Sequence, residues 1–265
     1  METENGILTE RTGSPEFYIF TSYLWQSPGL NGIDHHYNIS LHRNRLIAAA
    51  QAFNLHQVHS VLVQDINCKQ LIESVERHLT DRKNTKKGWT KIKLCIYADV
   101  RLHIESTNIH PMDEQDPFPQ PPDFNTIFSS TSSAYCRLRL DTQSVSPSLF
   151  SRHKTSERSQ YNRARKAAGI EHDSPCVSEV LLFNPNSEIS ECSLSTPYFQ
   201  RRGRWVTPPL SSGGNAGVSR SMAITAGLCG EGVVSVESVR DQELVWISNA
   251  VRGFIPAKVD LANHH

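Results

Sequence analysis

The stretch "TPPLSSGGNAGVSRS" (residues 207–221) combines two prolines, three glycines and small side chains just before a segment with helical character. Gly/Ser-rich stretches are often flexible connectors. This one joins the extended segment 204–209 to the segment 218–228, in which Met222, Ala223 and Ala226 suit a helix. Glycines before a helix leave backbone N–H groups and the positive end of the helix dipole available to an anion. The stretch therefore indicates either a connector or a phosphate-binding loop, although it matches neither the Walker nor the dinucleotide pattern.

The composition limits the classes of function. The 265 residues are 38% hydrophobic, which is ordinary for a globular protein, and 27 basic residues balance 27 acidic ones. This neutral balance argues against a nucleic-acid partner. Residues 1–17 lack the apolar core of a signal peptide, and no apolar run approaches the ~20 residues that a bilayer span requires. We expect a cytoplasmic protein that binds neither nucleic acid nor membrane.

The cysteines and histidines do not form a recognisable metal motif. Six cysteines are scattered without a CxxC pair, so we expect reduced thiols that mostly fill the core. Twelve histidines are dispersed, and none has a partner at an interval typical of a metal site. The sequence predicts no metal site.

The first hundred residues alternate between helical and extended patterns. Aromatic and β-branched residues predict a strand over 17–25. Apolar residues at helical spacing predict helices over 40–54, with Ser40 as the N-cap, and over 68–80. Alternation over 91–105 predicts two strands around Asp99. These elements indicate a small N-terminal α/β domain, residues 1–112.

A proline-rich segment follows and predicts a linker over 113–125. The C-terminal domain, residues 126–265, is richer in predicted strands. They lie over 134–141, over 178–184, in a hairpin around Gly203 and over most of 243–257, and a helix over 156–169 closes with Gly169. The predicted fold class is α/β (α+β) with two domains.

Three features of the C-terminal domain occur in an order that has a chemical meaning. Lys154 follows an apolar stretch just before a helix, Glu191 ends a short strand, and the glycine loop comes third. A lysine nucleophile, a carboxylate for a pyridine nitrogen and a phosphate loop are what a pyridoxal phosphate enzyme requires. Each residue alone could equally be a solvated surface charge.

Five motifs together resemble one family. They are "PSLFxRHKTxxRxxYxxAR", "EVLLxN", "ExSLSTPYF", "RWVTPPxSSGGNxGxxR" and "SNxxRGFxP", in this order. The chain is similar in these motifs to the class IV aminotransferases, or fold type IV pyridoxal phosphate enzymes, and most of all to fungal members that resemble aminodeoxychorismate lyase. The resemblance extends from Phe17 to Ala257. It implies a small N-terminal α/β domain, a larger strand-rich C-terminal domain and a homodimer with its active site between the domains.

The resemblance also implies roles for individual residues. Lys154 matches the lysine that binds pyridoxal 5'-phosphate as a Schiff base, and Glu191 matches the partner of the pyridine nitrogen. The expected phosphate-site contacts are Arg45 in "LHRNRL", Val218, Ser219 and Asn249. His42 and Arg45 are three residues apart and share a helical face, and a guanidinium suits a phosphate. The chain departs from the family where Cys192 replaces a glycine and Thr196 replaces an asparagine.

The expected reaction is that of aminodeoxychorismate lyase, which forms 4-aminobenzoate, a folate precursor, and pyruvate. The alternative is an aminotransferase acting on a D-amino acid, a branched-chain amino acid or an amine. A third possibility is a cofactor-binding protein without catalysis. The presence of both Lys154 and Glu191 argues against it, because a silent site has no physical need for both.

Overall fold

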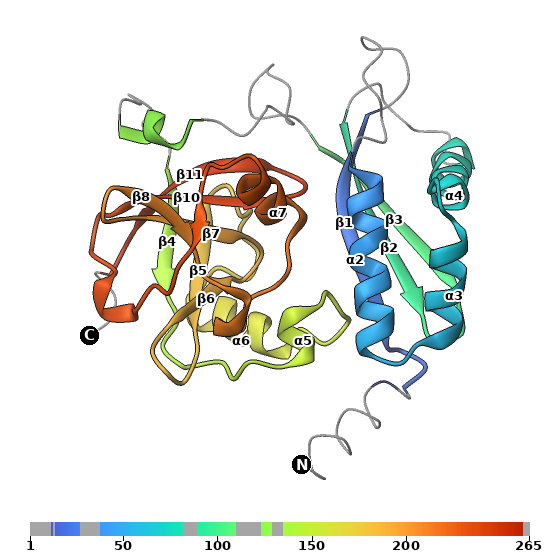
Figure 1. Cartoon of the computed structure of the whole chain (residues 1–265), viewed down its shortest axis with the longest axis horizontal. Coiled ribbons are helices and arrows are strands. Elements are labelled where there is room, and N and C mark those ends of the chain that lie inside the picture. The colour runs from blue at the N-terminus through green and yellow to red at the C-terminus, as the bar shows by residue number, and fades with distance from the viewer. Residues whose placement is uncertain are drawn as a thin grey trace. The chain divides into compact units, whose positions relative to one another are not determined.

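The computed structural model describes residues 12, 14–26, 38–81, 89–109, 123–128 and 135–261. The chain divides into two compact units. One comprises Met1–Gln115 with the short segment His153–Glu157, and the other comprises Asp116–Arg152 and Arg158–His265. Each unit contains helices and strands, and the mixed α/β class predicted from the sequence is confirmed (Figure 1).

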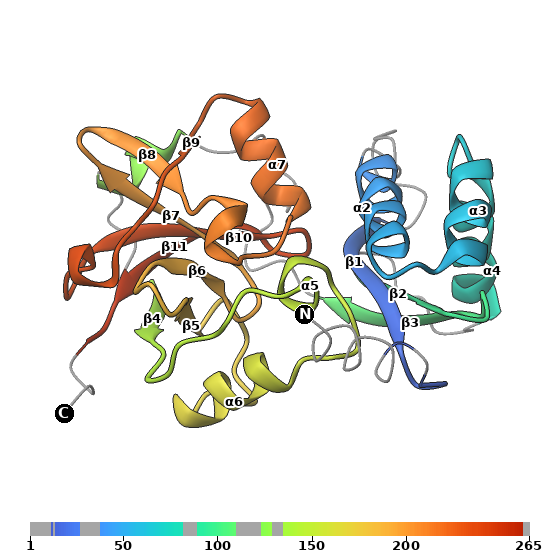
Figure 2. The same cartoon turned by 60° about the horizontal axis from the view of Figure 1, so that its bottom comes forward.

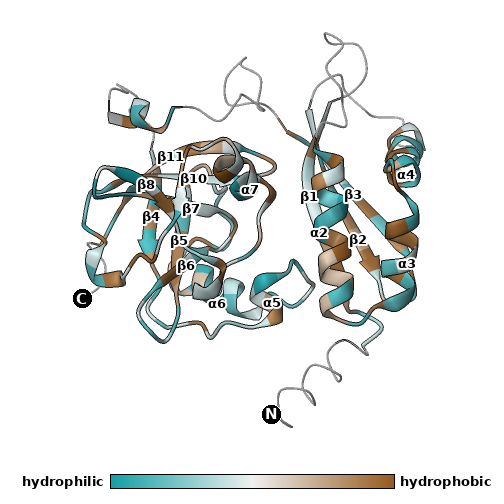
Figure 3. Cartoon of the chain, in the orientation of Figure 1, coloured by the Kyte–Doolittle hydropathy of each residue, from teal (hydrophilic) through white to brown (hydrophobic). Residues whose placement is uncertain are grey.

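The first unit is built on a three-stranded antiparallel sheet. Its order is β1 (Tyr18–Gln26), β2 (Trp89–Tyr97) and β3 (Leu102–Ile109). The helices are α2 (Ile39–Ala52), α3 (His56–Gln64) and α4 (Lys69–Asp81), and they lie on one face of the sheet (Figures 1 and 2). Buried positions alternate along most of β2, which carries apolar residues (Figure 3). This period of two is what a sheet with one covered face requires.

One prediction in this unit needs correction, and one helix was missed. Asn38, not Ser40, is the N-cap residue of α2, so Ser40 lies inside the first helical turn. Helix α3 was not predicted. Only Val58 and Leu62 of this nine-residue helix are buried, so its apolar period is too short to stand out in the sequence.

The segment His153–Glu157 extends the edge of β1. Ile19 and Thr155 form an antiparallel bridge. The Phe20 amide donates to the Lys154 carbonyl at 2.9 Å, and the Ser156 amide donates to the Tyr18 carbonyl at the same distance. These backbone bonds satisfy polar groups at the edge of the strand. They explain why this segment packs with the first unit, although the sequence placed it within the C-terminal domain 126–265.

The second unit contains an eight-stranded mixed sheet of order β6-β5-β4-β11-β10-β7-β8-β9. The strands are β4 (Cys136–Leu140), β5 (Ser178–Phe183), β6 (Ile189–Cys192), β7 (Thr196–Arg201), β8 (Arg204–Thr207), β9 (Gly230–Glu231), β10 (Leu244–Asn249) and β11 (Gly253–Val259). The helices are α5 (Leu149–Arg152), α6 (Ser159–Ala167) and α7 (Val218–Thr225). The strands predicted from the sequence, the hairpin around Gly203 and the helix ended by Gly169 are therefore confirmed.

Strand alternation sorts the side chains of this sheet into separate buried clusters. Leu181, Phe199 and Ile247 belong to one cluster. Leu182, which follows Leu181, packs with residues of α6, and Tyr198, which precedes Phe199, packs with residues of α7. Figure 2 shows both helices flanking the strands. The alternation therefore determines which strand residues can reach the side chains of α6 and α7.

The predicted linker lies mostly outside the described residues. Its last two residues, Phe124 and Asn125, begin the 3-10 helix Phe124–Phe128, and the Phe124 ring is fully buried among the rings of Tyr198, Trp205 and Trp246. This packing makes the end of the predicted linker part of the buried aromatic cluster rather than a spacer. The domain boundaries themselves stay predictions.

None of the helices in the described ranges combines the length and hydropathy that a bilayer span requires. In the same ranges, no group of three or more His, Cys, Asp or Glu side chains could hold a metal ion.

Candidate active site

Glu191 lies on β6 with a carboxylate held by a tyrosine. Its side chain is buried at 9% exposure. The Tyr161 hydroxyl, on α6, donates to Glu191 Oε1 at 2.6 Å and lies 3.3 Å from the Ser151 carbonyl. A buried carboxylate is costly unless it is hydrogen-bonded, so this bond both stabilises the charge and fixes its direction. Glu191 is therefore an oriented acceptor rather than a surface charge.

Cys192, at a position where the family resemblance implies a glycine, points away from Glu191. It belongs to the cluster of Leu181 and Phe199, whereas Glu191 pairs in register with Leu182, whose side chain packs with α6. Burial raises the pKa of the Cys192 thiol well above its usual range. The substitution thus adds a neutral core side chain and leaves the face that carries Glu191 unchanged.

The turn after Glu191 is held by a buried ion pair. Glu179, fully buried on β5, accepts hydrogen bonds from the Ser193 hydroxyl and, at 2.9 Å, from the Leu194 amide. Arg165 of α6 lies 3.5 Å from the same carboxylate and donates to the Ser193 hydroxyl at 3.1 Å. Burial raises the pKa of Glu179. These contacts fix the serine-rich turn that leads from β6 into β7.

The glycine loop lies within the second unit and packs closely against β6. Gly213 has φ +104°, in the left-handed region that favours glycine. A Cβ atom on Gly214 would lie 2.3 Å from the Ser190 carbonyl oxygen and 3.4 Å from Glu191 Cβ. The Asn215 side chain donates to the Ser151 carbonyl at 3.2 Å. These contacts give the loop a defined structure and argue against the reading as a flexible connector.

Val218 and Ser219 form the first turn of α7, which begins after Gly217. Both residues are buried, and no side chain caps this helix among the residues that the structure describes. The Ser219 hydroxyl accepts a hydrogen bond of 2.8 Å from Ser248. The helix start therefore presents backbone N–H groups, the positive end of a dipole and one serine, which together suit an anion.

The Asn249 side chain shapes a turn between β10 and β11. Its Oδ1 accepts hydrogen bonds from the amides of Val251, at 3.0 Å, and Arg252, at 2.9 Å. Its Nδ2 donates to the Ser195 hydroxyl at 3.3 Å. Asn249 thus ties this turn to the serine turn after Glu191, a structural role that the sequence did not reveal.

Lys154 and Arg45 both belong to the first unit, where they influence His42. His42 is buried, and its Nδ1 lies 2.6 Å from the Thr21 hydroxyl. Burial, followed by the nearby charges of Arg45 and Lys154, lowers the pKa of His42 to about 3. The histidine is therefore neutral at physiological pH. Lys154 Nζ lies 5.3 Å from the centroid of the Phe20 ring, a cation–π contact on β1.

Both groups of residues fit pyridoxal 5'-phosphate. In the second unit, the start of α7 could hold a phosphate, and Glu191 could face a ring nitrogen. In the first unit, Lys154 could supply the amine, and Arg45 lies on the same helix as buried His42. The chemistry of this donor set matches the cofactor expected from the sequence.

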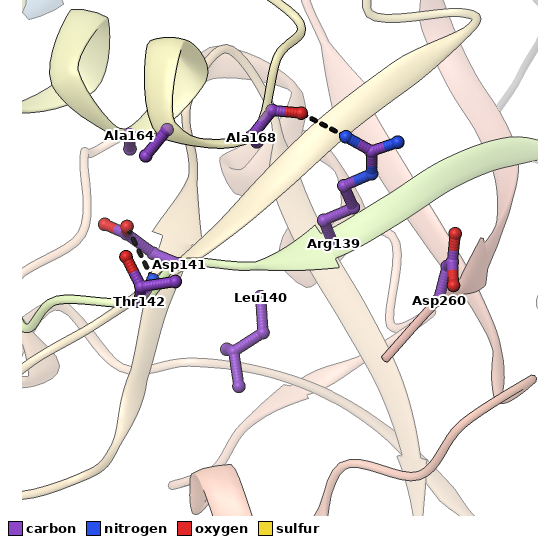
Figure 4. Close-up of a pocket in the computed structure, with 8 residues that line it drawn as sticks. Arg139, Leu140, Asp141, Thr142, Ala164, Ala168 and Asp260 are labelled. Carbon is purple, nitrogen blue, oxygen red and sulfur yellow. Dashed lines mark hydrogen bonds between the residues drawn. The ribbon is translucent and has the colours of Figure 1, made fainter. Parts of the chain in front are cut away.

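A separate cavity of about 80 Å³ in the second unit contains none of the predicted site residues. It is lined by Arg139, Asp141, Thr142, Ala164 and Asp260, among others (Figure 4). The Asp141 carboxylate is already paired with Arg163 at 2.5 Å and with the Thr142 amide at 2.8 Å. This cavity is distinct from the residues that the sequence singled out.

Comparisons with known proteins identify the fold. Residues 19–259 match the family described as amino-transferase class IV. A candidate amino-acid aminotransferase from Mesorhizobium loti aligns with a TM-score of 0.62 at 21% identity, covering 92% of this chain and 99% of that one. A candidate 4-amino-4-deoxychorismate lyase aligns with a TM-score of 0.59 at 19% identity, covering 91% and 84%. A candidate branched-chain amino acid aminotransferase from Thermotoga maritima aligns with a TM-score of 0.60 at 17% identity, covering 98% of this chain and 81% of that one. No curated protein matches the chain.

The close approach at Gly214 predicts a stability difference between two glycines. Gly214→Ala places a methyl group against backbone, and overpacking of this kind costs about 1–3 kcal/mol. Gly217→Ala meets the Thr196 hydroxyl at 3.2 Å, a side chain that can shift. Thermal unfolding followed by circular dichroism should show a lower Tm, or a lower soluble yield, for Gly214→Ala. Equal Tm values would contradict the close packing of loop and strand.

His42 predicts a pH dependence of stability. The unfolded chain protonates this histidine below pH 6.5, whereas the folded chain resists protonation until about pH 3. Stability from His42 is therefore complete above pH 6.5 and is lost as the pH falls toward 3, by about 1.4 kcal/mol per pH unit. We would measure the free energy of unfolding in urea between pH 4.5 and 7.5. It should change more steeply with pH for the wild type than for His42→Asn. Parallel slopes would show that His42 protonates freely.

Proposed function

Because the chain belongs to the class IV aminotransferase family, we propose that it converts 4-amino-4-deoxychorismate to 4-aminobenzoate and pyruvate, a step that supplies a folate precursor. Enzymes of this family use pyridoxal 5'-phosphate and act on small-molecule amines, so the chain is a pyridoxal phosphate-dependent enzyme. The observation that carries the proposal is the buried Glu191 carboxylate, oriented by Tyr161 at 2.6 Å.

We assign the cofactor contacts to six residues. Lys154 would bind it covalently, and Glu191 would hold a proton at its ring nitrogen. Arg45, the first turn of α7 with Val218 and Ser219, and Asn249 would bind and orient it at the phosphate end. When bound, pyridoxal 5'-phosphate supplies an aldehyde that condenses with amines and a ring that accepts electrons.

Lys154 Nζ would move the proton of the reaction. It would take the proton from the substrate ring carbon that carries the amine. Loss of that proton and of the enolpyruvyl group makes the ring aromatic. A proton returned to the CH₂ carbon of the leaving group gives pyruvate, so no atoms are gained or lost. Tyr161 would keep Glu191 aligned throughout, because a fixed hydrogen bond needs no reorganisation.

The five ordered motifs support the family, and their similarity to fungal members that resemble aminodeoxychorismate lyase is our reason for proposing the lyase reaction first. The same Lys154 and Glu191 could also serve aminotransfer to a D-amino acid, a branched-chain amino acid or an amine. That reaction begins with the same proton abstraction but requires a keto acid as second substrate. The requirement for a keto acid therefore distinguishes the two reactions.

We further propose a cytoplasmic homodimer. All six cysteines are free thiols and five of them are buried, which suits a reducing compartment. The homodimer rests on the family resemblance.

The proposed reaction predicts that the purified protein forms 4-aminobenzoate from 4-amino-4-deoxychorismate without any keto acid. The product is measured by its fluorescence after chromatography, and pyruvate is measured with a coupled dehydrogenase. The two products should appear in equal amounts. Product formation that depends on an added keto acid would instead identify the protein as an aminotransferase.

The role of Glu191 predicts a selective loss. Glu191→Gln should keep the cofactor bound, because the glycine loop and Lys154 are unchanged. Turnover should fall by about 100-fold or more, because an amide cannot hold the ring nitrogen protonated. Tyr161→Phe, which removes only the orienting hydroxyl, should cause a smaller loss. Near-normal turnover in Glu191→Gln would show that another acid has this role.

A further inference from the structure

Three buried hydroxyl groups form a chain that ends at the start of α7. The Tyr198 hydroxyl on β7 lies 2.7 Å from the Ser248 hydroxyl on β10. Ser248 in turn donates to the Ser219 hydroxyl at 2.8 Å. The exposed fractions of Tyr198, Ser248 and Ser219 are 0%, 1% and 6%, so the chain of hydroxyls is shielded from solvent. It crosses from the aromatic cluster to the first helical turn.

The direction of these hydrogen bonds follows from proton counting. Each hydroxyl carries one proton. Because Ser248 gives its proton to Ser219, Tyr198 must give its own to Ser248. The Ser219 proton is not used in the hydrogen bonds among the three hydroxyls, and no other hydrogen bond to the Ser219 hydroxyl occurs among the described residues. It is left to donate at the end of α7 that favours negative charge.

We propose that Tyr198 and Ser248 are positioning residues that make Ser219 a directed hydrogen-bond donor to the cofactor phosphate at the start of α7. This inference rests on the proposed placement of the phosphate. In a buried chain, each hydrogen bond polarises the next and strengthens it. Tyr198 thereby acts on the anion through two intervening hydroxyls.

The structure explains why these residues are suited to this role. Tyr198 is anchored by the rings of Phe124 at 5.1 Å and Phe254 at 5.8 Å, which hold its hydroxyl in place. Ser248 lies next to Asn249, whose side chain fixes the following turn. The first hydroxyl is therefore immobile, and each of the next two has one donor that restricts its rotation.

The test uses full-length apoprotein titrated with pyridoxal 5'-phosphate and, separately, with pyridoxal, which lacks the phosphate. Tyr198→Phe and Ser248→Ala should each weaken binding of pyridoxal 5'-phosphate by about 3- to 10-fold, and Ser219→Ala by about 10- to 100-fold. Pyridoxal binding should not change. In the Ser219→Ala background, Tyr198→Phe should not weaken binding of pyridoxal 5'-phosphate further, because the row of hydroxyls then no longer reaches the phosphate.

Thr207→Val is the matched control. Thr207 is a fully buried hydroxyl of the same unit that donates to the Pro197 carbonyl, outside the chain of three hydroxyls. It should leave both dissociation constants unchanged. Unchanged affinity in Tyr198→Phe, or equal losses for both ligands, or a loss that persists without the Ser219 hydroxyl, would each overturn the proposal. If the variants show these binding effects but the wild type forms no 4-aminobenzoate, only the proposed reaction is refuted.

Discussion

The backbone of the glycine loop lies directly against strand β6, and the organisation of the second unit depends on this contact. At Gly214 there is no room for a side chain, because a Cβ atom would lie 2.3 Å from the Ser190 carbonyl oxygen. The close approach places the start of α7 and the strand of Glu191 in one region. It thereby joins a place suited to an anion with an oriented carboxylate, and these two features define the candidate site.

Buried polar groups then fix the orientations of side chains and turns that backbone packing alone does not determine. Tyr161 orients Glu191, Glu179 and Arg165 hold the turn after it, and Asn249 ties that turn to the one after β10. Each group is costly to bury alone and becomes favourable only when its partners are present. Such sets specify a single arrangement more sharply than apolar packing does, because a small displacement breaks several bonds together.

The sequence was sufficient for the strands and most helices, because hydrophobic periods are local signals. Motif order assigned cofactor roles to single residues, and those roles stay predictions. The sequence could not reveal the partners. Tyr161 and Glu191 are 30 residues apart, and they meet because α6 packs against β5, the strand that pairs with β6. Tyr198 and Ser248 are 50 residues apart and are joined by strand pairing. A tyrosine in a sequence is interpreted as a core residue, and whether its hydroxyl also orients another group depends on its neighbours in the tertiary structure.

The backbone bonds between β1 and the segment that carries Lys154 have a consequence for folding. The Ser156 amide donates to the Tyr18 carbonyl, and the Tyr18 amide donates to the Ser156 hydroxyl, between residues that are 138 positions apart in the sequence. Such a long loop must close before these bonds form, and distant contacts of this kind slow folding. During synthesis, the first unit cannot be completed until residues 116–157 have left the ribosome, and these include the first part of the second unit. A fragment that stops after Gln115 would lack the segment that covers the edge of β1, and we expect it to be prone to aggregation.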